Sequence, residues 1–134
     1  MKHYFIYEKN NGNILSKYMG SWPELQTEPG CGYIECSATD SAEDWFVSDG
    51  VLTTRIIQHT VLSEYELLAD GIDEIQISSA PIGADITINN MTTGESVSGV
   101  IDGDDRFVTT SPGEYSITIC KLPYIPFKGV FNAN

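Results

Sequence analysis

The stretch SPGEYSITIC, residues 111–120, decides how this chain folds. Its apolar side chains Tyr115, Ile117 and Ile119 alternate with a serine and a threonine. In an extended strand, alternate side chains point to opposite faces of the sheet. The pattern therefore predicts a β-strand with one apolar face and one polar face. Because all three apolar side chains share a face, we expect this strand to be central in its sheet.

The residues around this stretch show the same kind of pattern. Apolar and polar residues alternate in short runs, and Gly, Pro, Asn and Asp separate these runs. We expect about six strands here, in the segments 72–81, 84–92, 96–103, 106–110, 111–124 and 126–134. No helix is available to connect parallel strands, so the pattern indicates an antiparallel β-sandwich. Pro123 and Pro126 cannot donate to a strand ladder, so the last segment should start irregularly and finish at a sheet edge.

Two hairpins and a lone strand are predicted in the first part of the chain. The aromatic run 3–8 and the run 14–19 flank the turn sequence NNGN, and Asn-Gly turns are typical of hairpins. A second hairpin is expected over 45–55, with Asp49 and Gly50 at its turn. Residues 33–38 read as a strand. Residues 21–32 contain two prolines and two glycines and should form a loop.

The stretch 56–69 separates these two parts and fits two structures. Its apolar residues Ile57, Val61, Leu62, Tyr65 and Leu68 fall near helical spacing. It also fits an extended linker that leads into a strand. We place the domain boundary in this stretch and expect an all-β chain with an N-terminal β-hairpin domain, residues 1–62, and a β-sandwich domain, residues 63–134.

The composition excludes some classes of partner. The chain has 134 residues, with 7 basic and 19 acidic ones, and its formal net charge is −12. Nucleic acids and anionic membranes both require a basic surface, so neither is an expected partner. A split after Leu67 leaves a charge of −6 on each part, so the acidity is not confined to a tail. It either keeps the protein soluble or complements a basic partner.

The N-terminus and the cysteines suggest a protein that stays in a cytoplasm or is exported without a signal of its own. The first apolar run has only four residues, too few for a secretory signal, and no run is long enough to span a membrane. Three cysteines cannot all pair, whereas secreted domains of this size usually pair theirs. Cys31 and Cys36 lack the two further ligands of a tetrahedral zinc site. Cys120 reads as a small core residue.

Catalytic and metal-binding signatures are weak. The two histidines, His3 and His59, do not fall in a hydrolase or metalloprotease motif. The grouped carboxylates lie at turns, where aspartate ordinarily caps backbone groups. The segment DGDD at 102–105 suggests calcium, but Arg106 follows where a ligand would be needed. We therefore expect a non-enzymatic protein without a cofactor or metal, and turn chemistry at 102–105.

Large apolar residues that are expected to be exposed are the candidate binding residues. Such a side chain either folds back onto the core or anchors a partner. The candidates are Trp22, Trp45, Tyr124, Ile125 and Phe127.

Both parts of the chain resemble known kinds of protein. The segments SAPIGADITINN and VIDGDDRFVTTSPGEYSITICKLPY resemble the small immunoglobulin-like or transthyretin-like modules of surface and virion proteins. The segments YFIYEKNNGNILSKYMGS, GCGYIECSA and WFVSDGVL resemble the N-terminal region of short tailed-bacteriophage proteins. These resemblances imply an immunoglobulin-like sandwich over 63–134 and a virion component assembled in a bacterial cytoplasm.

The expected function follows from these observations. The chain should be a tail- or tail-fibre-associated accessory protein that docks to other virion proteins in several symmetric copies. The alternatives are a capsid decoration protein and a carbohydrate-binding module that recognises host-surface glycans through the same aromatic residues.

Overall fold

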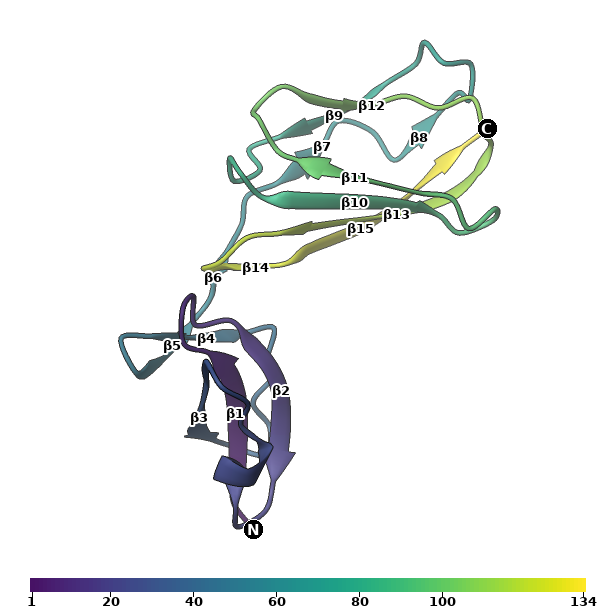
Figure 1. Cartoon of the computed structure of the whole chain (residues 1–134). Helices are drawn as coiled ribbons and strands as arrows, with labels where there is room; N and C mark the ends of the chain where they lie inside the picture. Colours follow the sequence, from purple (N-terminus) through teal and green to yellow (C-terminus); the bar gives the residue numbers. More distant parts are fainter. The chain divides into compact units, whose positions relative to one another are not determined.

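The computed structural model describes all residues from 1 to 134 and consists of strands, with one short 3-10 helix and no α-helix. The predicted all-β class is therefore confirmed. Contacts divide the chain into two compact units, Met1–Ile56 and Ile57–Asn134, which we call the first and second units (Figure 1). The sequence predicts this boundary a few residues later, after residue 62.

The first unit combines a small sheet with a separate hairpin. Its elements are β1 (His3–Glu8), β2 (Ile14–Met19), η1 (Pro23–Gln26), β3 (Cys31–Cys36), β4 (Trp45–Ser48) and β5 (Val51–Thr54). The sheet has the order β2-β1-β3 and is antiparallel. Both predicted hairpins, β1–β2 and β4–β5, are present.

Turn chemistry explains these two hairpins. Asp49 and Gly50 both have positive φ, 51° and 75°, as a two-residue hairpin turn requires. The N–H of Val47 donates to the carbonyl oxygen of Gly12 at 2.9 Å, which ties β4 to the first turn. A Cβ at Gly12 would lie 1.8 Å from the carbonyl oxygen of Val47, so only glycine fits there. The core beneath includes Phe5, which is fully buried.

The second unit contains the remaining strands. They are β6 (Ile56–Ile57, at the boundary), β7 (Val61–Leu62), β8 (Glu66–Leu67), β9 (Ile75–Ser78), β10 (Asp85–Asn90), β11 (Ser96–Val100), β12 (Asp105–Phe107), β13 (Gly113–Cys120), β14 (Tyr124–Ile125) and β15 (Phe127–Ala133). A five-stranded sheet has the order β11-β10-β13-β15-β8, and a three-stranded sheet has the order β12-β9-β7. β6 and β14 form a two-stranded pair.

The core of the second unit joins side chains from both of its larger sheets. As predicted, β13 is central, and Tyr115, Ile117 and Ile119 are buried on one face. They belong to the same core cluster as Ile75 and Ile77 of β9. The two sheets therefore form the layers of a β-sandwich (Figure 1).

In the second part of the chain, the structure decides between the two alternatives for residues 56–69 and corrects three predictions. Residues 56–69 are extended, with β6, β7 and β8 and no helix. The end of β15 is not a sheet edge, because Asn132 pairs with Glu66 of β8. That pairing is parallel, so the sandwich is not wholly antiparallel. Cys120 is exposed rather than in the core, because its side chain lies on the same face of β13 as Ser116 and Thr118.

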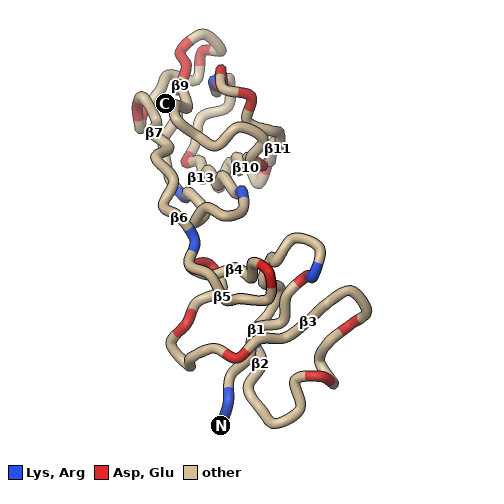
Figure 2. The backbone as a smooth tube through the Cα atoms, turned by 90° about the vertical axis from the view of Figure 1, so that its left-hand side faces the viewer, with Lys and Arg blue, Asp and Glu red and all other residues tan.

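Acidic residues are distributed along the chain in both units, as Figure 2 shows. The first unit contains four basic and eight acidic residues, and the second contains three and eleven. No helix has the length and apolar character needed to cross a membrane.

The hydroxyl of Tyr115 provides a test of the packing in the second unit. It donates to the carbonyl oxygen of Ser111 at 2.7 Å and lies 2.8 Å from Oγ1 of Thr109. Tyr115→Phe should lower the free energy of unfolding by about 1–2 kcal/mol, because these bonds are lost in a buried setting. Urea unfolding followed by circular dichroism measures this change. Tyr65→Phe, at an exposed ring, is the control, and an equal effect of both substitutions would contradict the assignment.

Candidate partner-binding surface

Trp22 is exposed on a short turn of the first unit that two hydrogen bonds stabilise. Its carbonyl oxygen accepts a hydrogen bond from the N–H of Leu25 at 3.2 Å, which starts η1. Thr27 Oγ1 donates to the carbonyl oxygen of Pro23 at 2.8 Å and closes the turn. The Pro23 side chain is buried and anchors the turn, while 62% of the Trp22 surface is exposed. The ring therefore does not fold back onto the core.

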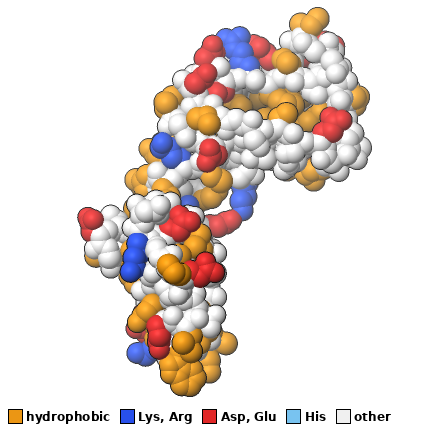
Figure 3. Space-filling model, in the orientation of Figure 1, with side chains coloured by type: hydrophobic (Ala, Val, Ile, Leu, Met, Phe, Trp, Pro, Cys, Tyr) orange, Lys and Arg blue, Asp and Glu red, His pale blue; other side chains and the backbone are white.

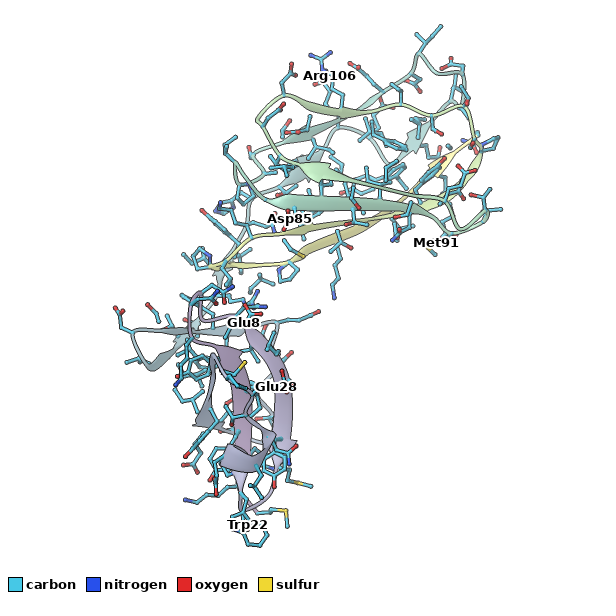
Figure 4. All side chains as sticks on the ribbon, in the orientation of Figure 1. Glu8, Trp22, Glu28, Asp85, Met91 and Arg106 are labelled. Carbon is cyan, nitrogen blue, oxygen red and sulfur yellow. The ribbon has the colours of Figure 1, made fainter.

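Two further apolar side chains lie on the same part of the first unit. Met19 ends β2, three residues before Trp22, and Leu25 lies within η1. Met19 is 58% exposed and Leu25 is 75% exposed. We call Met19, Trp22 and Leu25 the tip cluster. Figure 4 labels Trp22 at the end of the first unit, and Figure 3 shows hydrophobic side chains gathered there.

Trp45, the second predicted candidate, is partly buried at the start of β4. Its carbonyl oxygen accepts a hydrogen bond from Nε of Arg55 at 2.8 Å. The N–H of Arg55 also donates to the carbonyl oxygen of Asp44 at 2.7 Å. Trp45 is thus held at the base of the β4–β5 hairpin, with less of its ring available than that of Trp22.

The other three candidates belong to the second unit and are partly buried. Phe127 packs against the core cluster of this unit. The carbonyl oxygen of Ile125 accepts a hydrogen bond from Nε2 of the buried Gln58 at 2.8 Å, and the N–H of Tyr124 donates to the carbonyl oxygen of Lys121. This segment is therefore fixed to its own unit, and Trp22 is the predicted candidate with the largest free apolar surface.

The grouped carboxylates cap backbone N–H groups, as expected from their position at turns. In the segment 102–105, Oδ1 and Oδ2 of Asp105 accept from the N–H groups of Asp102 and Gly103 at 3.3 and 3.1 Å. Arg106 forms ion pairs with Asp104 and Glu74 at 3.2 and 3.1 Å. The predicted turn chemistry is confirmed.

The structure does not bring the histidines or cysteines together with other groups in a catalytic or metal-binding arrangement. His3 lies on β1, and His59 is exposed between β6 and β7. No group of three or more His, Cys, Asp or Glu side chains is placed to hold a metal ion. All three cysteines are free.

Comparisons with protein-family models, with curated proteins and with solved structures find no match to the chain.

Sequence reasoning missed several exposed apolar residues. Leu25 was treated as part of an irregular loop, although its position three residues after Trp22 is the spacing of one 3-10 turn. The exposed valines of β11, Val97 and Val100, were read only as part of a strand. No local signal reveals which strand is left at a sheet edge, because that depends on pairing between distant residues.

Asp70 provides a pH test of the turn chemistry. Its carboxylate accepts hydrogen bonds from the N–H groups of Asp73 and Ile72, both at 2.8 Å, and these bonds hold its pKa below the usual value. The stabilisation is present above the unfolded pKa of about 3.9 and is lost as the pH falls through the lower folded pKa. The free energy of unfolding should therefore fall more steeply in acid for the wild type than for Asp70→Asn. Parallel pH curves would contradict this.

Cysteine reactivity tests the burial pattern. Burial raises the pKa of the Cys36 thiol, and the positive charge of Lys17 partly offsets this effect. Since the thiolate is the reactive form, we expect Cys36 to react with iodoacetamide more slowly than the exposed Cys120. Mass spectrometry of partly alkylated protein measures both rates, with denatured protein as the control. Faster reaction of Cys36 in the folded protein would be inconsistent with this structure.

Proposed function

We propose that the chain is a non-enzymatic docking protein and that the tip cluster is a contact surface for a protein partner. The main observation that supports this proposal is the exposed ring of Trp22, which lies on a turn stabilised by hydrogen bonds. Tryptophan is enriched among the residues that dominate binding energy, and a fixed turn reduces the entropy lost on binding. Met19 and Leu25, which are three residues away on either side in the sequence, are also exposed and add apolar surface.

The biological setting that we propose is a tailed-bacteriophage virion, where the chain would be a tail- or tail-fibre-associated accessory protein present in several symmetric copies. This part of the proposal rests on the resemblance of the segments 4–21, 30–38 and 45–52 to phage proteins. An acidic surface on both units suits a protein that docks to basic patches of its neighbours. Capsid decoration is the alternative within the same setting.

We also infer that the second unit is an immunoglobulin-like sandwich. Its two layers and the Tyr115 hydroxyl support this inference. Tyr115 lies near the start of β13, and its hydroxyl donates to the backbone four residues upstream. A tyrosine with this type of bond is characteristic of immunoglobulin-like domains.

Particle incorporation tests the docking function. Virus particles are purified from cells that encode the wild-type chain, Trp22→Ala or Ile72→Ala, and the chain is quantified by mass spectrometry. Trp22→Ala should reduce incorporation at least about tenfold, since truncation of a tryptophan at a hot spot typically costs 2 kcal/mol or more. It should change the free energy of unfolding by less than about 0.5 kcal/mol, because the ring is exposed.

Ile72→Ala is the matched control, since Ile72 is a large exposed residue outside the tip cluster. Absence of the wild-type chain from particles would contradict the virion assignment. Equal incorporation of wild type and Trp22→Ala would contradict the docking role of the tip cluster.

A glycan-binding role is the second candidate, because the exposed Trp22 ring also offers a flat apolar face to a sugar. Binding of the purified chain to an array of bacterial surface glycans, lost in Trp22→Ala, would favour this role over protein docking. Protein docking predicts no glycan binding by the wild type.

A further inference from the structure

We propose that β11 and the groove beside it bind an extended segment of another protein, with basic residues at its ends, by addition of a β-strand. This surface belongs to the second unit and does not involve the tip cluster, so the inference goes beyond the proposed function.

The first observation is that β11 is an open sheet edge. It is the last strand of the five-stranded sheet, and its only strand neighbour is β10. All five of its residues are exposed, including Val97 at 56% and Val100 at 62%. An exposed edge with unpaired backbone groups is a template for a further strand.

The hydrogen-bond pattern shows which backbone groups are free. At the two ends of the β10–β11 pairing, the N–H of Asn90 donates to Glu95 at 2.7 Å, and that of Ile101 donates to Ala84 at 2.9 Å. Hydrogen-bonded and non-bonded pairs alternate along an antiparallel ladder. Residues 97 and 99 therefore bond to β10, whereas residues 96, 98 and 100 direct their N–H and C=O groups away from it.

A groove runs beside this edge because the two layers have unequal numbers of strands. Five strands face three, and β11 and β12 are the outer strands on this flank. Between them lies a hollow of about 300 Å³, and Ile77, Ile88 and Phe107 contribute to its wall. A second hollow of about 140 Å³ shares Ile88, Val97 and Phe107 with it, so the two lie next to each other. Figure 3 shows hydrophobic side chains on this face of the second unit.

An unpaired polar group lies at one end of the groove. Asn90 contributes to the wall of the smaller hollow and is 2% exposed. Its Oδ1 accepts from the N–H groups of Thr92 and Thr93, but its Nδ2 has no acceptor. A buried donor without an acceptor costs free energy, and a ligand at this end would offer one.

The charged residues of the groove indicate which kind of protein segment binds there. The walls of the two hollows contain the carboxylates of Glu95, Asp104 and Asp105 and one guanidinium, that of Arg106. Arg106 (labelled in Figure 4) already pairs with Asp104 and with Glu74. A second copy would bring two equally acidic grooves together, which is unfavourable. The groove therefore fits a foreign strand with apolar side chains at alternate positions and Lys or Arg at its ends.

A pair of synthetic peptides tests this proposal on the whole chain. The first peptide has lysine at both ends and alternating valine and threonine between them, and the second has glutamate at both ends instead. The lysine peptide should bind at least about tenfold more tightly, because like charges at an interface are unfavourable. Amide chemical shifts should change in β11 and β12.

Three variants localise the binding. Ser98→Pro removes an outward N–H that β10 does not use, and Val97→Asp places a charge in the groove; both should weaken binding at least about tenfold. Val130→Asp, at an exposed valine of β15, is the matched control and should bind like the wild type. Circular dichroism checks that each variant is folded.

Three outcomes would overturn the proposal: no binding of the lysine peptide, equal binding of both peptides, or unchanged binding by Ser98→Pro and Val97→Asp. Dimerisation of the chain through β11, detected by sedimentation, would also overturn it in favour of a second copy. Trp22→Ala should leave peptide binding unchanged, so failure of the tip-cluster proposal and failure of this one are distinguishable.

Discussion

The packing of β13 against the opposite layer is the interaction on which the second unit depends. Tyr115, Ile117 and Ile119 are buried on one face of this strand and share a core with side chains of the three-stranded sheet. Each side chain of this size contributes about 1.5–3 kcal/mol when it is fully buried. The core therefore fixes which face of the five-stranded sheet is covered. The outermost strand of that sheet, β11, extends to a flank where its valines remain exposed.

Features that depend on neighbouring residues were predictable from the sequence. The turn at Asp49 and Gly50 requires positive φ at both positions, and this dipeptide adopts it readily. The alternation around Ile117 correctly predicted a buried face and a central strand. The carboxylates at 102–105 were correctly assigned to turn capping, because the acceptors and donors lie within three residues of each other.

Features that depend on distant residues were not predictable in the same way. The pairing of β15 with β8, through Asn132 with Glu66 and Ala133 with Leu67, joins parts of the chain far apart in sequence, and it is why β15 does not end at an edge. The exposure of Trp22 depends on the burial of Pro23 and on the bonds of Thr27, which set the direction of the turn. Cys120 was misread because its apolar neighbours suggested a core position, although strand parity places it on the other face.

The account also gives the two units different surfaces. The first unit presents an apolar cluster on a bonded turn, and the second presents free backbone groups beside an apolar groove with acidic residues. The central claim is that the outer edge of β11, the last strand of the five-stranded sheet, is unpaired. Amide hydrogen exchange of the free chain tests it most directly. The account predicts fast exchange at residues 96, 98 and 100 and slow exchange at residues 97 and 99. Slow exchange at all five residues would show that the edge is already paired and would contradict the account.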